Sequence, residues 1–129
     1  MTEKYLIANW KMQLDKEQAI QQASLLAKLL SEEKISKDLR VVLCPDFIAL
    51  SEVADIIKGS KIALGAQDGF YEEAGAFTSQ VSMRQIKEAA CQFVILGHSE
   101  RRKLGESDEI INKKIKAALE QGLVPIVCV

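Results

Sequence analysis

The sequence has little of what marks several specialised classes of protein. Its 129 residues include one histidine, one tryptophan, two prolines and three cysteines. No apolar run approaches the roughly 18 to 20 residues of a membrane span, and the start lacks the apolar stretch and cleavage site of a signal peptide. Seventeen basic residues against 18 acidic ones leave a net charge of −1, without the basic excess of nucleic-acid binders. We therefore expect a cytoplasmic protein that binds neither nucleic acid nor membrane.

The cysteines do not form a recognisable disulfide or metal framework. Cys44, Cys91 and Cys128 are odd in number and far apart, with no CxxC pair or histidine-rich cluster beside them. Cys44 and Cys128 lie within apolar runs, where a thiol packs as a small hydrophobic group. We expect structural thiols and no metal site.

Composition indicates one globular domain over residues 1–129. Hydrophobic residues make up 48% of the chain and charged residues 27%. A chain of this length buries roughly two-thirds of the surface that its unfolded form exposes. It therefore needs neither disulfides nor a metal to form a core.

Short β-branched runs alternate with longer segments of helical period. Strands are predicted at 5–8, 41–44, 62–66, 93–96 and 124–129. Four helices are predicted between them. The first starts at Asp15 with Gln18 at capping-box spacing, and the third, over 82–90, has Ser82 and Gln85 at the same spacing. The second, over 47–58, stops at Gly59, and the fourth, through 111–119, ends at Gly122. This alternation predicts an α/β protein with a parallel sheet.

Two architectures fit this alternation. A doubly wound five-stranded sheet suits 129 residues, and a receiver-like protein of that kind would take a phosphoryl group on Asp46 or Asp68. It would also need an acidic cluster after the first strand, where Asn9-Trp10-Lys11 offers none. A (β/α)8 barrel needs about 250 residues, and the expected strands recur about every 30 residues, which suits its repeat. Because residues 123–129 end within an apolar strand without a closing helix, we expect a chain cut within its fifth strand.

Polar residues gather where the predicted strands end, which is where parallel α/β folds place their functional groups. His98 could donate a hydrogen bond to a substrate oxygen or be a packed side chain, and Glu100 could be an acid, a base or an ion-pair partner. Lys11 could stabilise a developing negative charge or simply be solvated. Asn9 could orient a carbonyl or close a turn.

Several common motifs are incomplete or missing. His98-Ser99-Glu100 has the H-x-E of zinc deaminases, but no P-C-x-x-C follows. There is no GxGxxG and no GxxxxGK[ST] phosphate loop. Ser99 directly follows His98, which is a poor geometry for a nucleophile and its base, and no G-x-S-x-G is present.

Five blocks together resemble one family, in order and at the right spacing from residue 4 to 129. The blocks are A-N-W-K-M at 8–12, G-A-Q-D at 65–68, G-A-F-T at 75–78, G-H-S-E-R-R at 97–102 with Gly105-Glu106, and V-P-I-V-C-V at 124–129. They resemble triosephosphate isomerase. The resemblance implies the TIM (β/α)8 barrel, here a partial barrel with five parallel strands and four helices.

The resemblance also implies a reaction and the residues that carry it. The family interconverts dihydroxyacetone phosphate and D-glyceraldehyde 3-phosphate in glycolysis and gluconeogenesis, without cofactor or metal. By this likeness His98 is the electrophile that polarises the carbonyl, and Lys11 stabilises the enediolate and holds the phosphorylated substrate. Asn9 and Ser99 are similar to the family's substrate-binding residues, and Glu100 to the carboxylate that orders Lys11.

Other parts of the family's machinery lie outside this resemblance. The general-base glutamate, the lid loop and the glycine-rich phosphate grip belong to the second half of the barrel, and none lies within residues 1–129. We therefore expect an amino-terminal fragment that is inactive alone. The alternative is a non-enzymatic half-barrel that complements or oligomerises with another chain.

The family's dimer contact is present with changes. The interface loop usually reads Thr-Gly-Glu and here reads Thr78-Ser79-Gln80, so the charge that faces Arg101 is missing, and Gln13 replaces the usual Asn or His. A homodimer is still the expectation for the full-length protein. For the chain alone, we expect open edges at 5–8 and 124–129 to cause self-association.

Overall fold

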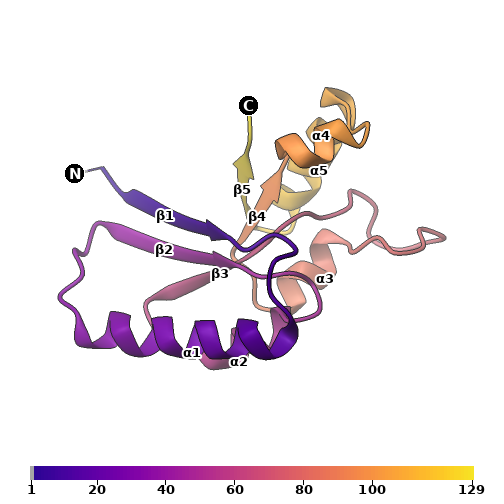
Figure 1. Cartoon of the computed structure of the whole chain (residues 1–129). Helices are drawn as coiled ribbons and strands as arrows, with labels where there is room; N and C mark the ends of the chain where they lie inside the picture. Colours follow the sequence, from indigo (N-terminus) through magenta and orange to yellow (C-terminus); the bar gives the residue numbers. More distant parts are fainter. Residues whose placement is uncertain (1) are drawn as a thin grey trace.

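A single parallel sheet organises the chain, in a computed structural model that describes residues 2–129 (Figure 1). Its strands are β1 (Lys4–Asn9), β2 (Leu39–Cys44), β3 (Ile62–Ala66), β4 (Phe93–Leu96) and β5 (Val124–Val127). They lie side by side in the order of the sequence, and every neighbouring pair is parallel. A doubly wound sheet reverses its winding and breaks this order. The partial-barrel prediction is therefore confirmed, and the receiver-like alternative is wrong.

Apart from one short turn at the end of β4, the helices lie on the outer face of the sheet. They are α1 (Lys16–Glu32), α2 (Leu50–Ile57), α3 (Met83–Glu88), α4 (Ser99–Lys103) and α5 (Asp108–Glu120). Figure 1 shows α1 and α2 along β1 to β3, and α4 and α5 beside β4 and β5. The predicted count of four helices is corrected by α4, which is one short turn after β4. Five residues are too few to produce a readable apolar period.

The capping signals predicted from spacing are present. Asp15 accepts a hydrogen bond from the Gln18 N–H while the Gln18 side chain accepts one from the Asp15 N–H, and Ser82 and Gln85 repeat the arrangement. Gly122 follows α5 with φ +70°, the left-handed conformation that glycine adopts without steric cost. These helix starts and stops are therefore local properties of the sequence.

Several predicted boundaries are wrong by a few residues, and three of them are informative. The second helix begins at Leu50 rather than 47, because Asp46 Oδ1 accepts the N–H groups of Ile48 and Ala49 and holds a turn there. The third ends at Glu88 rather than 90, since Ala90 takes φ +68°. The last strand ends at Val127 rather than 129.

The central strands, β2 to β4, are mostly apolar and buried on both faces. Successive side chains alternate, so Val41, Leu43 and Leu64 pack against the helices in an outer core. Side chains of the opposite parity form an inner cluster, which comprises Val42, Cys44, Ala63, Phe93 and Ile95 with Ile126 and Cys128 against it. Tyr5 meets Phe93 edge to face across this inner side, with ring centroids 6.0 Å apart. The sheet therefore curls toward a barrel interior.

The cysteines behave as packed thiols. Cys44 and Cys91 are buried, and burial raises the pKa of each thiol to about 12. Such thiols stay protonated and unreactive at neutral pH. The burial of Cys44 agrees with the prediction that it packs as a small hydrophobic group, and Cys128 lies partly buried against the inner cluster.

Gly65 is a glycine because the inner cluster leaves no room for a side chain. A Cβ there would lie 2.6 Å from Cys44 Sγ and 3.2 Å from Val42 Cγ1. We expect Gly65→Ala to lower the free energy of unfolding by about 1–3 kcal/mol, as overpacking of a core does. Urea unfolding measures it. Cys44→Ala in the same chain should recover part of the loss, and equal losses with and without Cys44→Ala would contradict this account.

The two edge strands expose apolar side chains. Leu6 of β1 is 58% exposed and Val124 of β5 is 51% exposed. Unpaired strand edges of this kind template further pairing. We expect the chain to self-associate at roughly 10–100 µM, as seen by light scattering with size-exclusion chromatography. A well-folded monomer throughout that range would disprove this expectation.

Candidate functional site

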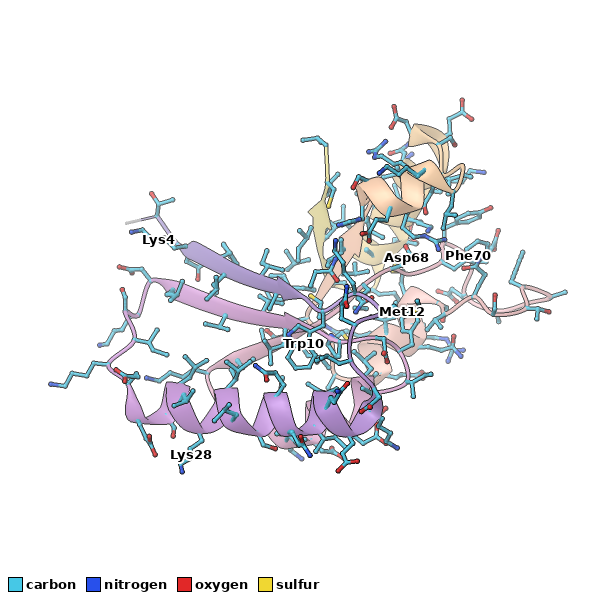
Figure 2. All side chains as sticks on the ribbon, viewed as in Figure 1. Lys4, Trp10, Met12, Lys28, Asp68 and Phe70 are labelled. Carbon is cyan, nitrogen blue, oxygen red and sulfur yellow. The ribbon has the colours of Figure 1, made fainter. Side chains whose placement is uncertain are left out.

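The carboxyl ends of the first four strands line one cleft of about 290 Å³. Of the residues singled out from the sequence, it is lined by Asn9, Lys11, Asp46, Asp68, Gln80, His98, Glu100 and Arg101. In Figure 2, Trp10, Met12 and Asp68 lie at this end of the sheet, whereas Lys4, at the start of β1, lies at the other. The parallel topology is the reason, because it brings all the strand ends to one rim.

Lys11 occupies a strained turn directly after β1. Its φ of +55° is left-handed, which is unfavourable for a residue with a Cβ. Asn9 Oδ1 accepts the Lys11 N–H at 3.0 Å, so the Asn9 side chain closes this turn. From it the Lys11 side chain reaches the loop after β4, where Nζ donates to Glu100 Oε1 at 2.9 Å. The cation therefore has a defined direction in the cleft.

His98 is the N-cap of α4 and lies beside this ion pair. Its Nδ1 accepts the Glu100 backbone N–H at 3.1 Å. In a neutral imidazole one nitrogen accepts and the other carries the proton, so Nε2 is left as a donor. The side chain is about three-quarters buried. His98 can thus present a fixed N–H to an oxygen in the cleft.

Glu100 connects the two groups. Its backbone N–H holds His98, and its carboxylate pairs with Lys11. The hydrogen bond from Lys11 lowers the pKa of Glu100, and the charges of Lys11 and Lys103 act in the same direction. A carboxyl group with a lowered pKa is a poor base at neutral pH.

A second charged cluster lies behind the cleft, and the sequence reasoning missed it. Lys114 Nζ, on α5, lies 2.9 Å from Asp68 Oδ1 and 2.8 Å from Glu106 Oε1. Arg101 Nε lies 3.3 Å from Asp68 Oδ2 and 3.1 Å from Glu106 Oε2. Lys114 is only 2% exposed. One signal was available, because Lys114 is three residues after Ile111 and shares the buried face of its helix.

The cluster also gives Arg101 partners within its own chain. Arg101 was expected to lack the charge that usually faces it, because Gln80 replaces a glutamate. Asp68 and Glu106 supply carboxylates instead. Burial acts to raise the pKa of Glu106, but Lys114 and Arg101 outweigh it and hold that pKa below its ordinary range.

Two predicted residues lie at the margin of the site. Ser99 is exposed as the first residue of α4 and does not line the cleft. Thr78 is exposed on the arm of residues 70–81 between β3 and α3, which projects from the body in Figure 1. Phe70 and Phe77 pack within this arm, with ring centroids 4.9 Å apart.

Residues 2–129 contain no group of three His, Cys, Asp or Glu side chains placed to hold a metal ion. Within the same residues, no helix is both long and apolar enough to span a membrane.

Comparison with known proteins gives one consistent result. The family model described as triosephosphate isomerase matches residues 4–129. The chain is 45% identical over 125 residues to a triosephosphate isomerase of Thermoanaerobacter pseudethanolicus, covering 96% of the chain and 49% of that protein. It is 46% identical over 123 residues to one of Symbiobacterium thermophilum, covering 95% and 47%.

A solved structure agrees. The crystal structure of triosephosphate isomerase from Bartonella henselae superposes with a TM-score of 0.88 at 34% identity, over 97% of this chain and 51% of that one. The chain spans about half the length of the curated relatives it matches.

Proposed function

The chain belongs to the triosephosphate isomerase family, and from this premise we propose that it supplies the electrophilic part of a site that interconverts dihydroxyacetone phosphate and D-glyceraldehyde 3-phosphate. One observation carries the proposal. Lys11 and His98, which follow β1 and β4, both contact Glu100 in one cleft. The reaction removes a proton beside a carbonyl, and the resulting negative oxygens need a donor and a fixed cation.

His98 is the proposed electrophile. Its Nε2–H donates to the carbonyl oxygen of the substrate and polarises it, which lowers the barrier to loss of the neighbouring proton. The same nitrogen moves a proton between the two oxygens of the enediolate. The hydrogen bond that the Glu100 backbone N–H donates to Nδ1 keeps the His98 ring in the orientation that this role requires.

Lys11 is the proposed electrostatic partner. Its ammonium stabilises the enediolate and the phosphate of the substrate, and Glu100 holds it in place through the 2.9 Å ion pair. Asn9 and Ser99 are proposed as substrate-binding residues; Asn9 also shapes the turn that carries Lys11. The reaction as proposed needs neither cofactor nor metal.

The setting follows the family. We propose a cytoplasmic enzyme of glycolysis and gluconeogenesis that acts as a homodimer in its full-length form. Thr78 and Gln80 on the projecting arm, with Arg101, are the proposed contact with the partner subunit. The exposure of the arm supports this.

A second candidate function is a non-enzymatic half-barrel that complements or oligomerises with another chain. The exposed apolar side chains of β1 and β5 favour it, because they leave two edges for a partner. In this case His98 and Lys11 would have no catalytic role.

Complementation separates the two functions. The chain is co-expressed with the second half of the Thermoanaerobacter pseudethanolicus relative, and the purified complex is assayed for isomerase activity. The proposal expects turnover that His98→Ala lowers by about 10²- to 10⁴-fold, while the exposed Lys116→Ala leaves it unchanged. A folded complex without turnover, or with turnover insensitive to His98→Ala, would support the non-enzymatic function.

A further inference from the structure

The left-handed backbone of Lys11 needs support from outside its own turn. Lys11, Ser79 and Ala90 are the non-glycine residues with positive φ between residues 2 and 129. Such a conformation persists where the surrounding structure holds it. In the site proposed above, the conformation also decides where Nζ of Lys11 points, so whatever holds it acts on the site.

Gln67 makes the contact that fits this need. Its Nε2 donates two hydrogen bonds, each of 2.9 Å, to the carbonyl oxygens of Lys11 and Cys44. An amide nitrogen has two protons to donate, and its oxygen could not face two carbonyls, so the chemistry determines which way the amide lies. The Gln67 side chain is half-buried just after β3 and lines the cleft. It therefore joins the ends of three strands at one point.

The two carbonyls depend on Gln67 to different degrees. The Cys44 carbonyl also accepts the Trp10 N–H at 3.1 Å, so it keeps a donor if Gln67 is lost. The Lys11 carbonyl receives its hydrogen bond from Gln67. Removing the Gln67 amide should therefore destabilise mainly the Lys11 turn.

We propose that Gln67 is a positioning residue, whose amide holds Lys11 in its left-handed turn and so directs the ammonium to Glu100 and the cleft. That Gln67 matters for catalysis rests on the proposed function. That its amide holds the Lys11 turn rests only on the hydrogen bonds described above. Gln67 acts through Lys11 and touches no reacting atom.

The first test measures the ion pair between Lys11 and Glu100 and does not measure turnover. Its result is therefore independent of the proposed function. Gln67→Met keeps the side-chain length and removes both donors. In the full chain, NMR titration of Glu100 should show its midpoint rise toward the ordinary 4.5, because Lys11 no longer holds its place. Glu52, whose pKa is lowered by the hydrogen bond from Lys16 on α1, is the matched control and should not move. An unchanged Glu100 midpoint, or equal shifts at both glutamates, would overturn the proposal.

The second test asks whether the left-handed turn is what Gln67 supports. Gln67→Met should lower the unfolding midpoint by roughly 3–6 °C, and by as much in a Lys11→Ala background. In a Lys11→Gly background the loss should be clearly smaller, because glycine adopts positive φ without support. Equal losses in all three backgrounds would show that Gln67 only stabilises the sheet end. If Gln67→Met does not fold, the Lys11→Gly double variant should, and failure of both would also overturn the proposal.

Discussion

The 129-residue chain by itself is expected to show no isomerase turnover above the buffer rate. The proposed reaction needs a general base, and a positioned base contributes about 10²- to 10⁴-fold. Electrophile and base act as a unit, so His98 and Lys11 without a base are expected to retain little of the rate. The turnover rate is measured in a coupled assay with each triose phosphate at high enzyme concentration.

The carboxylates that line the cleft do not supply the missing base. Asp46 accepts two backbone N–H groups in the turn before α2. Asp68 is paired with Lys114 and Arg101. Glu100 is paired with Lys11, which lowers its pKa. Asp46 and Asp68 are thus already engaged by hydrogen bonds and ion pairs, and the lowered pKa of Glu100 weakens that carboxylate as a proton acceptor.

The control is His98→Ala in the same preparation. Turnover well above buffer that His98→Ala abolishes would contradict the prediction and show that the cleft holds a working base. Turnover that His98→Ala leaves unchanged would instead identify a contaminating isomerase from the expression host.

Lys114→Met is expected to lower the free energy of unfolding by about 3–5 kcal/mol, the largest stability effect predicted for a single side chain. Lys114 is 2% exposed and lies between Asp68 and Glu106. Removing one member of a buried ion network leaves the others without compensation for their lost hydration. Because small domains are stable by only about 5–15 kcal/mol, the variant is expected to be near its unfolding threshold at 37 °C.

Urea unfolding measures the loss. Lys116→Met, on the exposed side of the same helix, is the matched control and should change stability by no more than about 0.5 kcal/mol. Adding Asp68→Asn and Glu106→Gln to Lys114→Met should recover part of the loss, since the buried negative charges are removed with their cation. Equal effects at 114 and 116 would contradict a role for the network.

Acid should weaken the same network. The pKa of Glu106 in the folded chain lies below its ordinary value of 4.5, so its contribution is present above that value and lost as pH falls through the folded pKa. The wild-type chain should therefore lose more stability on acidification below about pH 4.5 than Lys114→Met does. A parallel pH dependence of the two would count against the network.

The sequence was informative wherever a signal is local. Capping boxes at Asp15 and Ser82 act over three residues, and both are present in the structure. The strands and helices alternate with a hydrophobic periodicity that can be read within each segment. All five strands were therefore predicted. The short α4 was not counted among the four predicted helices, because a single turn has no readable period.

Charge pairing was harder to predict. Lys114 and Asp68 are 46 residues apart, and nothing local to either one indicates its partner. The same applies to Gln67, which the sequence placed at a strand end but whose amide meets the carbonyl of Lys11, 56 residues away.

The sequence by itself determined the parallel α/β class, the helix caps, the strand ends where chemistry gathers, and the family. These depend on periodicity and on short motifs. The tertiary structure alone decided the left-handed turn of Lys11, the contact of Gln67 with that turn, and the network around Lys114. Each of these depends on groups that only folding brings within hydrogen-bonding distance, and such distances are properties of the packed sheet and not of any segment.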